Sequence, residues 1–131
     1  MAEIETRFAA TPTAPREARA FLRDALQTWR LDGVGEITEI LTSELVANVV
    51  RHVGAPGTLR ALSEGTTLRI EVDDVNHGVP VVRRHDANDT SGYGMVLVEE
   101  LSQRWGVDWH REGKTVWFEI DLPPGGGERP I

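Results

Sequence analysis

Four polar residues near the middle of the chain have types and a spacing that could form a polar site on one face of a helix. Glu44, Asn48 and His52 recur at every fourth position, and Arg51 lies beside the last of them. Side chains four apart lie on one face of a helix, so the Glu44 carboxylate and the Asn48 carboxamide could jointly hold a hydrated divalent cation through oxygen, the ligand type that magnesium prefers. The alternative interpretation of the same spacing is an ordinary solvated helix face.

The helix that would carry this polar row extends over about residues 35 to 53 and ends at the Gly-Ala-Pro-Gly segment 54–57. Its apolar residues form a wide stripe beside the row, which must face a core. They are Ile37, Ile40, Leu41, Leu45, Val46, Val49 and Val50. The polar row therefore borders the buried zone.

Three glycine-containing segments follow this helix, at residues 74–78, 92–95 and 113–115. Asp74 ends an apolar strand, where a carboxylate can accept a hydrogen bond from an exocyclic amine, although Asp-Val-Asn-His-Gly is also ordinary turn chemistry. Gly92 and Gly94 precede an apolar helix, which would let backbone N–H groups approach a phosphate. Without further context Thr115 is simply a β-branched strand residue.

Taken together, the order of these four segments resembles the four boxes of the GHKL ATPases, the superfamily of gyrase, Hsp90, histidine kinases and MutL, which share the Bergerat nucleotide-binding fold. Within it, Ser-Glu-Leu-Val-Ala-Asn at 43–48 and Gly-Lys-Thr-Val-Trp-Phe at 113–118 are similar to signatures of the anti-sigma-factor serine kinases of the RsbW and SpoIIAB type. The resemblance covers about residues 15 to 122.

The resemblance implies roles for individual residues. Glu44 would be the catalytic residue that orients or deprotonates the attacking nucleophile, and Asn48 would be the Mg²⁺ ligand. Asp74 would read the adenine amino group and favour ATP over GTP, and the Thr115 hydroxyl would join a water-mediated contact to Asp74. The full set implied to bind the nucleotide is Asn48, Arg51, His52, Asp74, Gly78, Gly92, Gly94, Met95 and Thr115.

Several residues leave alternatives open. Arg51 and His52 could pair with Glu44 or cap the end of their helix. Asn76 stands where the family has a glycine, although asparagine tolerates a left-handed backbone better than other non-glycine residues. Residues 75–91 have little periodicity and are interpreted as a short lid, in which Arg83, Arg84 and His85 could touch phosphate or stay solvated.

For the whole protein, the resemblance implies an ATP-binding anti-sigma factor with serine/threonine kinase activity toward an anti-anti-sigma protein of the STAS type. Its partners would be that protein and a sigma factor, and homodimerisation is implied as well. The alternatives are a non-catalytic module that binds nucleotide weakly or not at all and regulates a partner by docking, and a bare ATPase part of a larger assembly.

Bulk composition narrows the possible classes. The 131 residues suit one domain over 1–122, followed by a flexible tail over 123–131. A net charge of -7 argues against direct nucleic-acid binding, and the absence of cysteine excludes disulfides and thiolate chemistry. No apolar run approaches the roughly 20 residues needed to cross a bilayer, and the N-terminus lacks the pattern of a secretory signal, so we expect a cytoplasmic protein without membrane contact.

Periodicity along the chain predicts the elements that would position these residues. We expect strands at about 3–9, 58–62, 67–73, 104–110 and 114–122, and helices at about 15–30, 35–53 and 94–101. The predicted fold class is α+β, a two-layer α/β sandwich of the Bergerat type with a mixed, mostly antiparallel sheet and helices on one face.

Overall fold

A computed structural model describes residues 1–75 and 93–123 of the chain. The elements in chain order are β1 (Ala2–Phe8), α1 (Ala14–Thr28), a short 3₁₀ helix (Asp32–Val34), α2 (Gly35–His52), β2 (Gly57–Ser63), β3 (Thr67–Asp74), α3 (Tyr93–Leu101), β4 (Arg104–Trp109) and β5 (Lys114–Asp121). The predicted helices and strands are confirmed to within a few residues at each end.

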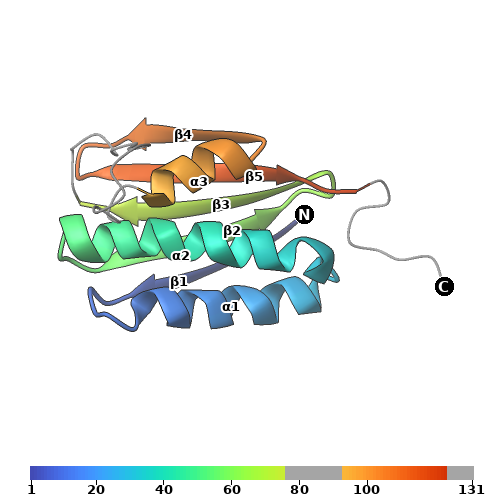
Figure 1. Ribbon diagram of the computed structural model, residues 1–131, viewed down its shortest axis with the longest axis horizontal. Coiled ribbons are helices and arrows are strands. Elements are labelled where there is room, and N and C mark those ends of the chain that lie inside the picture. Colours follow the sequence, from blue (N-terminus) through green and yellow to red (C-terminus); the bar gives the residue numbers. More distant parts are fainter. Residues whose placement is uncertain (76–92, 124–131) are drawn as a thin grey trace.

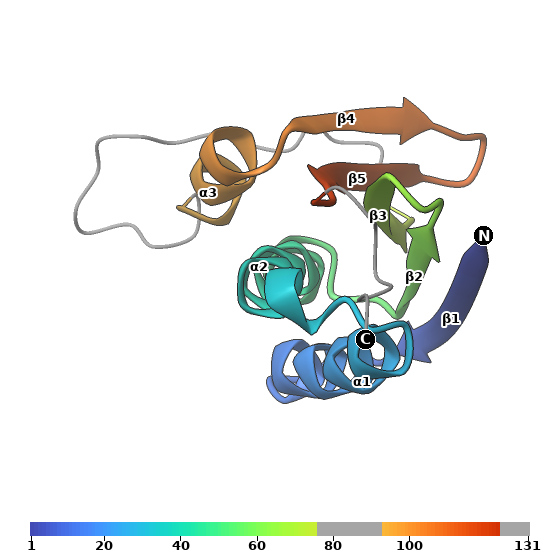
Figure 2. The ribbon, with the colours of Figure 1, turned by 90° about the vertical axis from the view of Figure 1, so that its right-hand side faces the viewer.

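The strands form one five-stranded sheet in the order β1-β2-β3-β5-β4, and every neighbouring pair is antiparallel. The helices α1, α2 and α3 lie on the same face of this sheet, as Figure 2 shows in a view along the strands. The predicted α+β two-layer sandwich is therefore confirmed. The sheet of the described residues is antiparallel throughout. Each connection is either a hairpin or a crossover, and in both cases every strand runs opposite to the strand beside it in the sheet.

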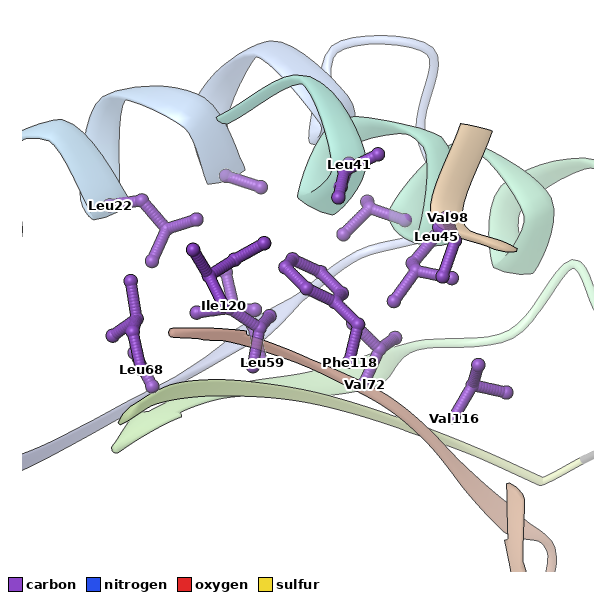
Figure 3. Packing of buried hydrophobic residues seen from close by; sticks show 14 of the residues in the cluster. Leu22, Leu41, Leu45, Leu59, Leu68, Val72, Val98, Val116, Phe118 and Ile120 are labelled. Carbon is purple, nitrogen blue, oxygen red and sulfur yellow. The ribbon is translucent and has the colours of Figure 1, made fainter. Parts of the chain in front are cut away.

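The core forms between the sheet and the helices because the strands alternate between buried and exposed residues. In β3, Leu68, Ile70 and Val72 are buried, whereas the residues between them point to the other face. Phe118 of β5 is fully buried and lies between the helix residues Leu41, Leu45 and Val98 and the sheet (Figure 3). This alternation fixes which face of the sheet the helices cover.

Helix boundaries follow local sequence signals. Pro15 lies in the first turn of α1, where its missing N–H costs nothing, and Thr13 donates a hydrogen bond to Glu17 at 2.8 Å. The helix ends with Arg30 in the left-handed region at φ 60°, followed by a bond from the Leu31 N–H to the Leu26 carbonyl at 2.7 Å. Gly54 at φ 67° marks the corresponding end of α2.

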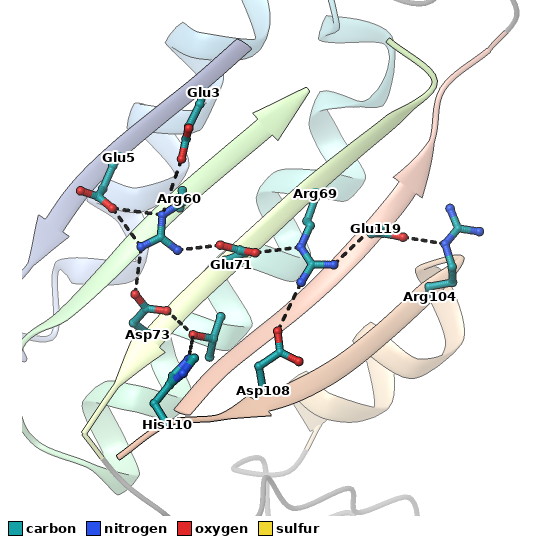
Figure 4. Close-up of polar contacts among 11 residues, drawn as sticks. Glu3, Glu5, Arg60, Arg69, Glu71, Asp73, Arg104, Asp108, His110 and Glu119 are labelled. Carbon is teal, nitrogen blue, oxygen red and sulfur yellow. Dashed lines mark hydrogen bonds and ion pairs between the residues drawn. The ribbon is translucent and has the colours of Figure 1, made fainter. Parts of the chain in front are cut away.

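The face of the sheet without helices carries a chain of arginine–carboxylate contacts (Figure 4). Arg69 stacks over the Trp117 ring, with its guanidinium carbon 4.1 Å from the ring centroid. Burial works against the charge on Arg60, but hydrogen bonds to its carboxylate partners outweigh it and raise the pKa of Arg60. The ion pairs join Arg60 to Glu3, Glu5, Glu71 and Asp73, Arg69 to Glu71, Asp108 and Glu119, and Arg104 to Glu119 and Asp121.

Two predicted segments, the lid and the C-terminal tail, lie almost entirely outside the residues that the structure describes. The predicted lid, with Arg83, Arg84 and His85, lies outside the described residues apart from Val75, and so does the predicted tail beyond Pro123. Among the helices that the structure describes, none is long and apolar enough to cross a membrane.

Candidate functional site

The polar row lies on α2 as predicted. Glu44 and Asn48 are half-buried, one turn apart, and Arg51 and His52 are exposed in the last turn. The opposite side of the helix is buried in the core through residues such as Leu41 and Leu45. The row therefore borders the buried layer, with its polar groups reaching solvent.

Contacts within the row differ between its members. Arg51 Nη2 donates a hydrogen bond to Asn48 Oδ1 at 3.3 Å, so Arg51 bonds to Asn48 rather than to Glu44. Within residues 1–75 and 93–123, no hydrogen bond or ion pair engages the Glu44 carboxylate. A charged acceptor without an internal partner is available to a ligand or a substrate proton.

The donor set of this row fits magnesium bound together with a nucleotide. An amide oxygen has two lone pairs, so Asn48 Oδ1 can accept from Arg51 and still ligate a cation. The described residues contain no cluster of three or more histidine, cysteine or acidic groups able to hold a metal. Mg²⁺ commonly keeps several waters and takes one or two protein ligands plus substrate phosphates, which is what a single carboxamide here would require.

Asp74 lies at the end of β3 on the helix-covered face of the sheet. Its side chain is 3% exposed, and Lys114 Nζ lies 3.0 Å from its Oδ1, with the lysine side chain 6% exposed. The two residues are directly opposite each other in the β3–β5 register. Sequence reasoning did not pair Lys114 with Asp74, although Lys114 alternates in phase with the core residues Val116 and Phe118.

Thr115 points to the opposite face of the sheet, so the predicted water-mediated contact to Asp74 is wrong for its hydroxyl. Thr115 Oγ1 instead bonds to Asp73 Oδ1 at 2.5 Å and lies 2.6 Å from His110 Nε2, a chain of contacts drawn in Figure 4. The physical reason is strand parity, because successive residues of β5 face opposite sides.

The glycine segments are described only in part. Gly78 and Gly92, and with them Asn76, lie outside the described residues. Gly94 lies in the first turn of α3, and Met95 is buried in the core. A Cβ at Gly113 would lie 1.9 Å from the Asp74 carbonyl oxygen, so only glycine lets β5 begin this close to the end of β3.

The remaining candidates gather at one end of the molecule. Figure 1 shows the end of α2, the end of β3 and the start of α3 at the same side. The α2 row and the Asp74–Lys114 pair therefore belong to neighbouring elements. Within residues 1–75 and 93–123, no hydrogen bond or ion pair joins the row to the pair.

Comparisons with known proteins bear on this arrangement. Residues 8–120 match the family model of the histidine kinase-like ATPase domain. A crystal structure of the RsbU and RsbW domains of Rv1364c from Mycobacterium tuberculosis matches with a TM-score of 0.66 and 20% identity, over 94% of this chain and 34% of that one. The chain thus spans about a third of the length of this structural relative, and no curated protein matches it. Because the family model covers most of the chain, this protein belongs to the histidine kinase-like ATPase domain family.

Proposed function

We propose that the chain is an ATP-binding anti-sigma factor of the RsbW type, with serine/threonine kinase activity toward an anti-anti-sigma protein of the STAS type. One observation carries the proposal. The Glu44 carboxylate, which has no internal partner among the described residues, lies one turn before the Asn48 carboxamide on the solvent-reaching side of α2, in a member of the histidine kinase-like ATPase family.

Each residue of the row has a distinct task in phosphoryl transfer. Glu44 accepts the proton of a serine or threonine hydroxyl on the partner. The hydroxyl oxygen forms a bond to the γ-phosphorus as the bond between that phosphorus and the leaving ADP oxygen breaks. Asn48 would hold a magnesium ion through Oδ1, and that ion would supply charge neutralisation to the phosphates. Arg51 donates a hydrogen bond to Asn48 Oδ1 at 3.3 Å and so keeps the carboxamide oxygen of Asn48 turned toward Arg51.

The rest of the nucleotide would be held at the same end of the fold. Asp74 accepts the hydrogen bond of the adenine amino group, which selects ATP over GTP. Backbone N–H groups near Gly92 and Gly94, at the start of α3, would meet the phosphates, since a helix N-terminus favours anions. The likeness to a structure that contains an RsbW domain supports a partner-switching role. The proposal also includes a sigma factor as the second partner, a homodimer as the working unit and the cytoplasm as the compartment.

The first test is calorimetry with Mg-ATP on the wild type and on Asn48→Ala. We expect saturable binding by the wild type and at least about a tenfold loss in the variant, because a direct metal ligand is removed. Glu36→Gln is the matched control, since Glu36 is exposed in the first turn of the same helix, and it should bind as the wild type does.

The second test is phosphate transfer from ATP to a purified STAS-domain protein of the same organism. Glu44→Gln keeps the shape of the side chain and should bind Mg-ATP normally while losing about 100-fold or more in transfer rate. Binding with no transfer by the wild type would leave the non-catalytic docking module as the function. An absence of binding by folded wild-type protein would refute the ATP site itself.

A further inference from the structure

Lys114 is the only lysine of the chain, among 14 lysine and arginine residues. Its ammonium lies in the helix-covered layer at the end of the sheet, where it pairs with Asp74 at 3.0 Å. An arginine would bring a planar fork of five donors to this position, whereas an ammonium is a compact point charge with three rotatable donors. The site therefore holds a small, adaptable donor beside a carboxylate acceptor.

Stability alone does not account for this pair. Desolvating two charges offsets much of their attraction, and a buried ion pair can often be replaced by apolar residues at no cost. The next residues in phase with the pair are apolar, Val72 on β3 and Val116 on β5. Asp74 and Lys114 also belong to the lining of a pocket of about 260 Å³ at the strand ends, together with Arg7, Asp73 and His110.

The geometry of the pair matches one edge of a purine. Adenine carries the exocyclic amine, a donor, next to the ring nitrogen N1, an acceptor. A carboxylate and an ammonium held 3.0 Å apart present the complementary acceptor and donor side by side. Because the three donors of an ammonium rotate together, the group can keep its bond to Asp74 Oδ1 and turn another donor toward a ligand.

We propose that Lys114 is a second base-reading residue, which donates a hydrogen bond to adenine N1 while Asp74 accepts one from the adenine amine. This inference rests on the proposed ATP site and adds to it a specificity-determining residue from β5. Reading two atoms instead of one makes recognition stricter, because a site that donates to N1 loses that hydrogen bond when the acceptor is missing.

The test compares the binding of three magnesium nucleotides to the full chain by calorimetry. They are ATP, 1-deaza-ATP, in which a C–H replaces N1, and 7-deaza-ATP, in which a C–H replaces N7 on the other edge. We expect 1-deaza-ATP to bind the wild type at least about tenfold more weakly than ATP, the loss typical of a hydrogen bond to a charged group. The 7-deaza nucleotide, as matched control, should bind like ATP.

Lys114→Met should remove the discrimination, so that ATP and 1-deaza-ATP bind this variant equally. Because both ligands are compared on one protein, general damage to the site cancels in the ratio. If the methionine variant does not fold by circular dichroism, Lys114→Gln, which keeps a donor without the charge, should show an intermediate ratio.

Two results would overturn the inference, and they differ from failure of the proposed function. Equal affinity of the wild type for ATP and 1-deaza-ATP refutes base reading by Lys114 and leaves the ATP site standing. Discrimination that persists unchanged in the Lys114 variant assigns it to another group and refutes the inference as well. If no nucleotide binds the folded wild type, both the ATP site and this inference fall.

Discussion

Removing either charge of the Asp74–Lys114 pair is predicted to destabilise the fold strongly, and removing both is predicted to cost clearly less than the sum of the two single losses. The two side chains are 3% and 6% exposed, so a charge that loses this partner is not solvated by bulk water in its place. Asp74→Asn keeps the shape of the carboxylate without its charge, and Lys114→Met keeps the length of the lysine side chain. With the double variant, these substitutions form a complete thermodynamic cycle.

The expected magnitude follows from the distance and the burial. Two unit charges at 3.0 Å attract each other by about 5 kcal/mol at an effective dielectric constant of about 20. Breaking a buried pair by removing one partner costs about 3–5 kcal/mol, a large share of the roughly 5–15 kcal/mol that stabilises an ordinary domain. We therefore expect each single variant to lose about 3–5 kcal/mol of unfolding free energy. The double variant should lose clearly less than their sum.

Urea denaturation followed by tryptophan fluorescence would measure all four proteins, since the chain has four tryptophans. The ion pair between Arg23 and Glu39 is the matched control. Its atoms are closer, at 2.7 Å, but the arginine side chain is 54% exposed, so its coupling should not exceed about 1 kcal/mol. Single losses below about 1 kcal/mol at Asp74 and Lys114, adding up in the double variant, would refute the argument that burial governs this pair.

Three further predictions concern stability. Gly113→Ala should lower the unfolding free energy by about 1–3 kcal/mol in thermal unfolding, because the added Cβ would lie 1.9 Å from the Asp74 carbonyl oxygen. Gly33→Ala is the matched control. A Cβ at Gly33 would have no atom within 4 Å, so this variant should stay within about 0.5 kcal/mol of the wild type. Phe118→Ala should cost about 3–5 kcal/mol in urea denaturation, because the ring is fully buried; a loss below about 1 kcal/mol would contradict the packing described. The hydrogen bond from Arg104 lowers the pKa of Glu119 below its ordinary value of 4.5. The stability that the ionised Glu119 contributes is therefore complete above pH 4.5 and is lost as the pH falls through the lowered pKa. Glu119→Gln should flatten the acid side of the plot of unfolding free energy against pH. An unchanged acid side would contradict this prediction.

Sequence periodicity was sufficient for the layers of this fold. Alternation in β3 and a continuous apolar stripe on α2 determine which side of each element is buried, and both are visible in the residue order. The position of Glu44 and Asn48 on the border of the buried layer follows from the same stripe. Local rules thus predicted the part of the site that one helix carries.

The part of the site built from two strands was not predicted, because it depends on the register between β3 and β5. These strands are neighbours in the sheet but are separated in sequence by a helix and another strand. The motif at residues 113–118 predicts a role for Thr115, whereas the register places Lys114 opposite Asp74. Counting parity back from the apolar residues Val116 and Phe118 would have assigned Lys114 to the inner face. The contacts of Arg69 with Glu119 depend on the same register and were not predicted for the same reason.

The position of the Asp74–Lys114 pair couples ligand recognition to folding. The α2 row can lose a polar group at small cost, because its members reach solvent, whereas the pair lies in the layer that holds β3 and β5 against the helices. A substitution on α2 therefore tests binding almost alone. A substitution at Asp74 or Lys114 changes stability and binding together, since the same desolvation that strengthens a hydrogen bond to a base also penalises an unpaired charge. Ratios between ligands on one protein separate these two effects, because the stability of that protein is common to both measurements.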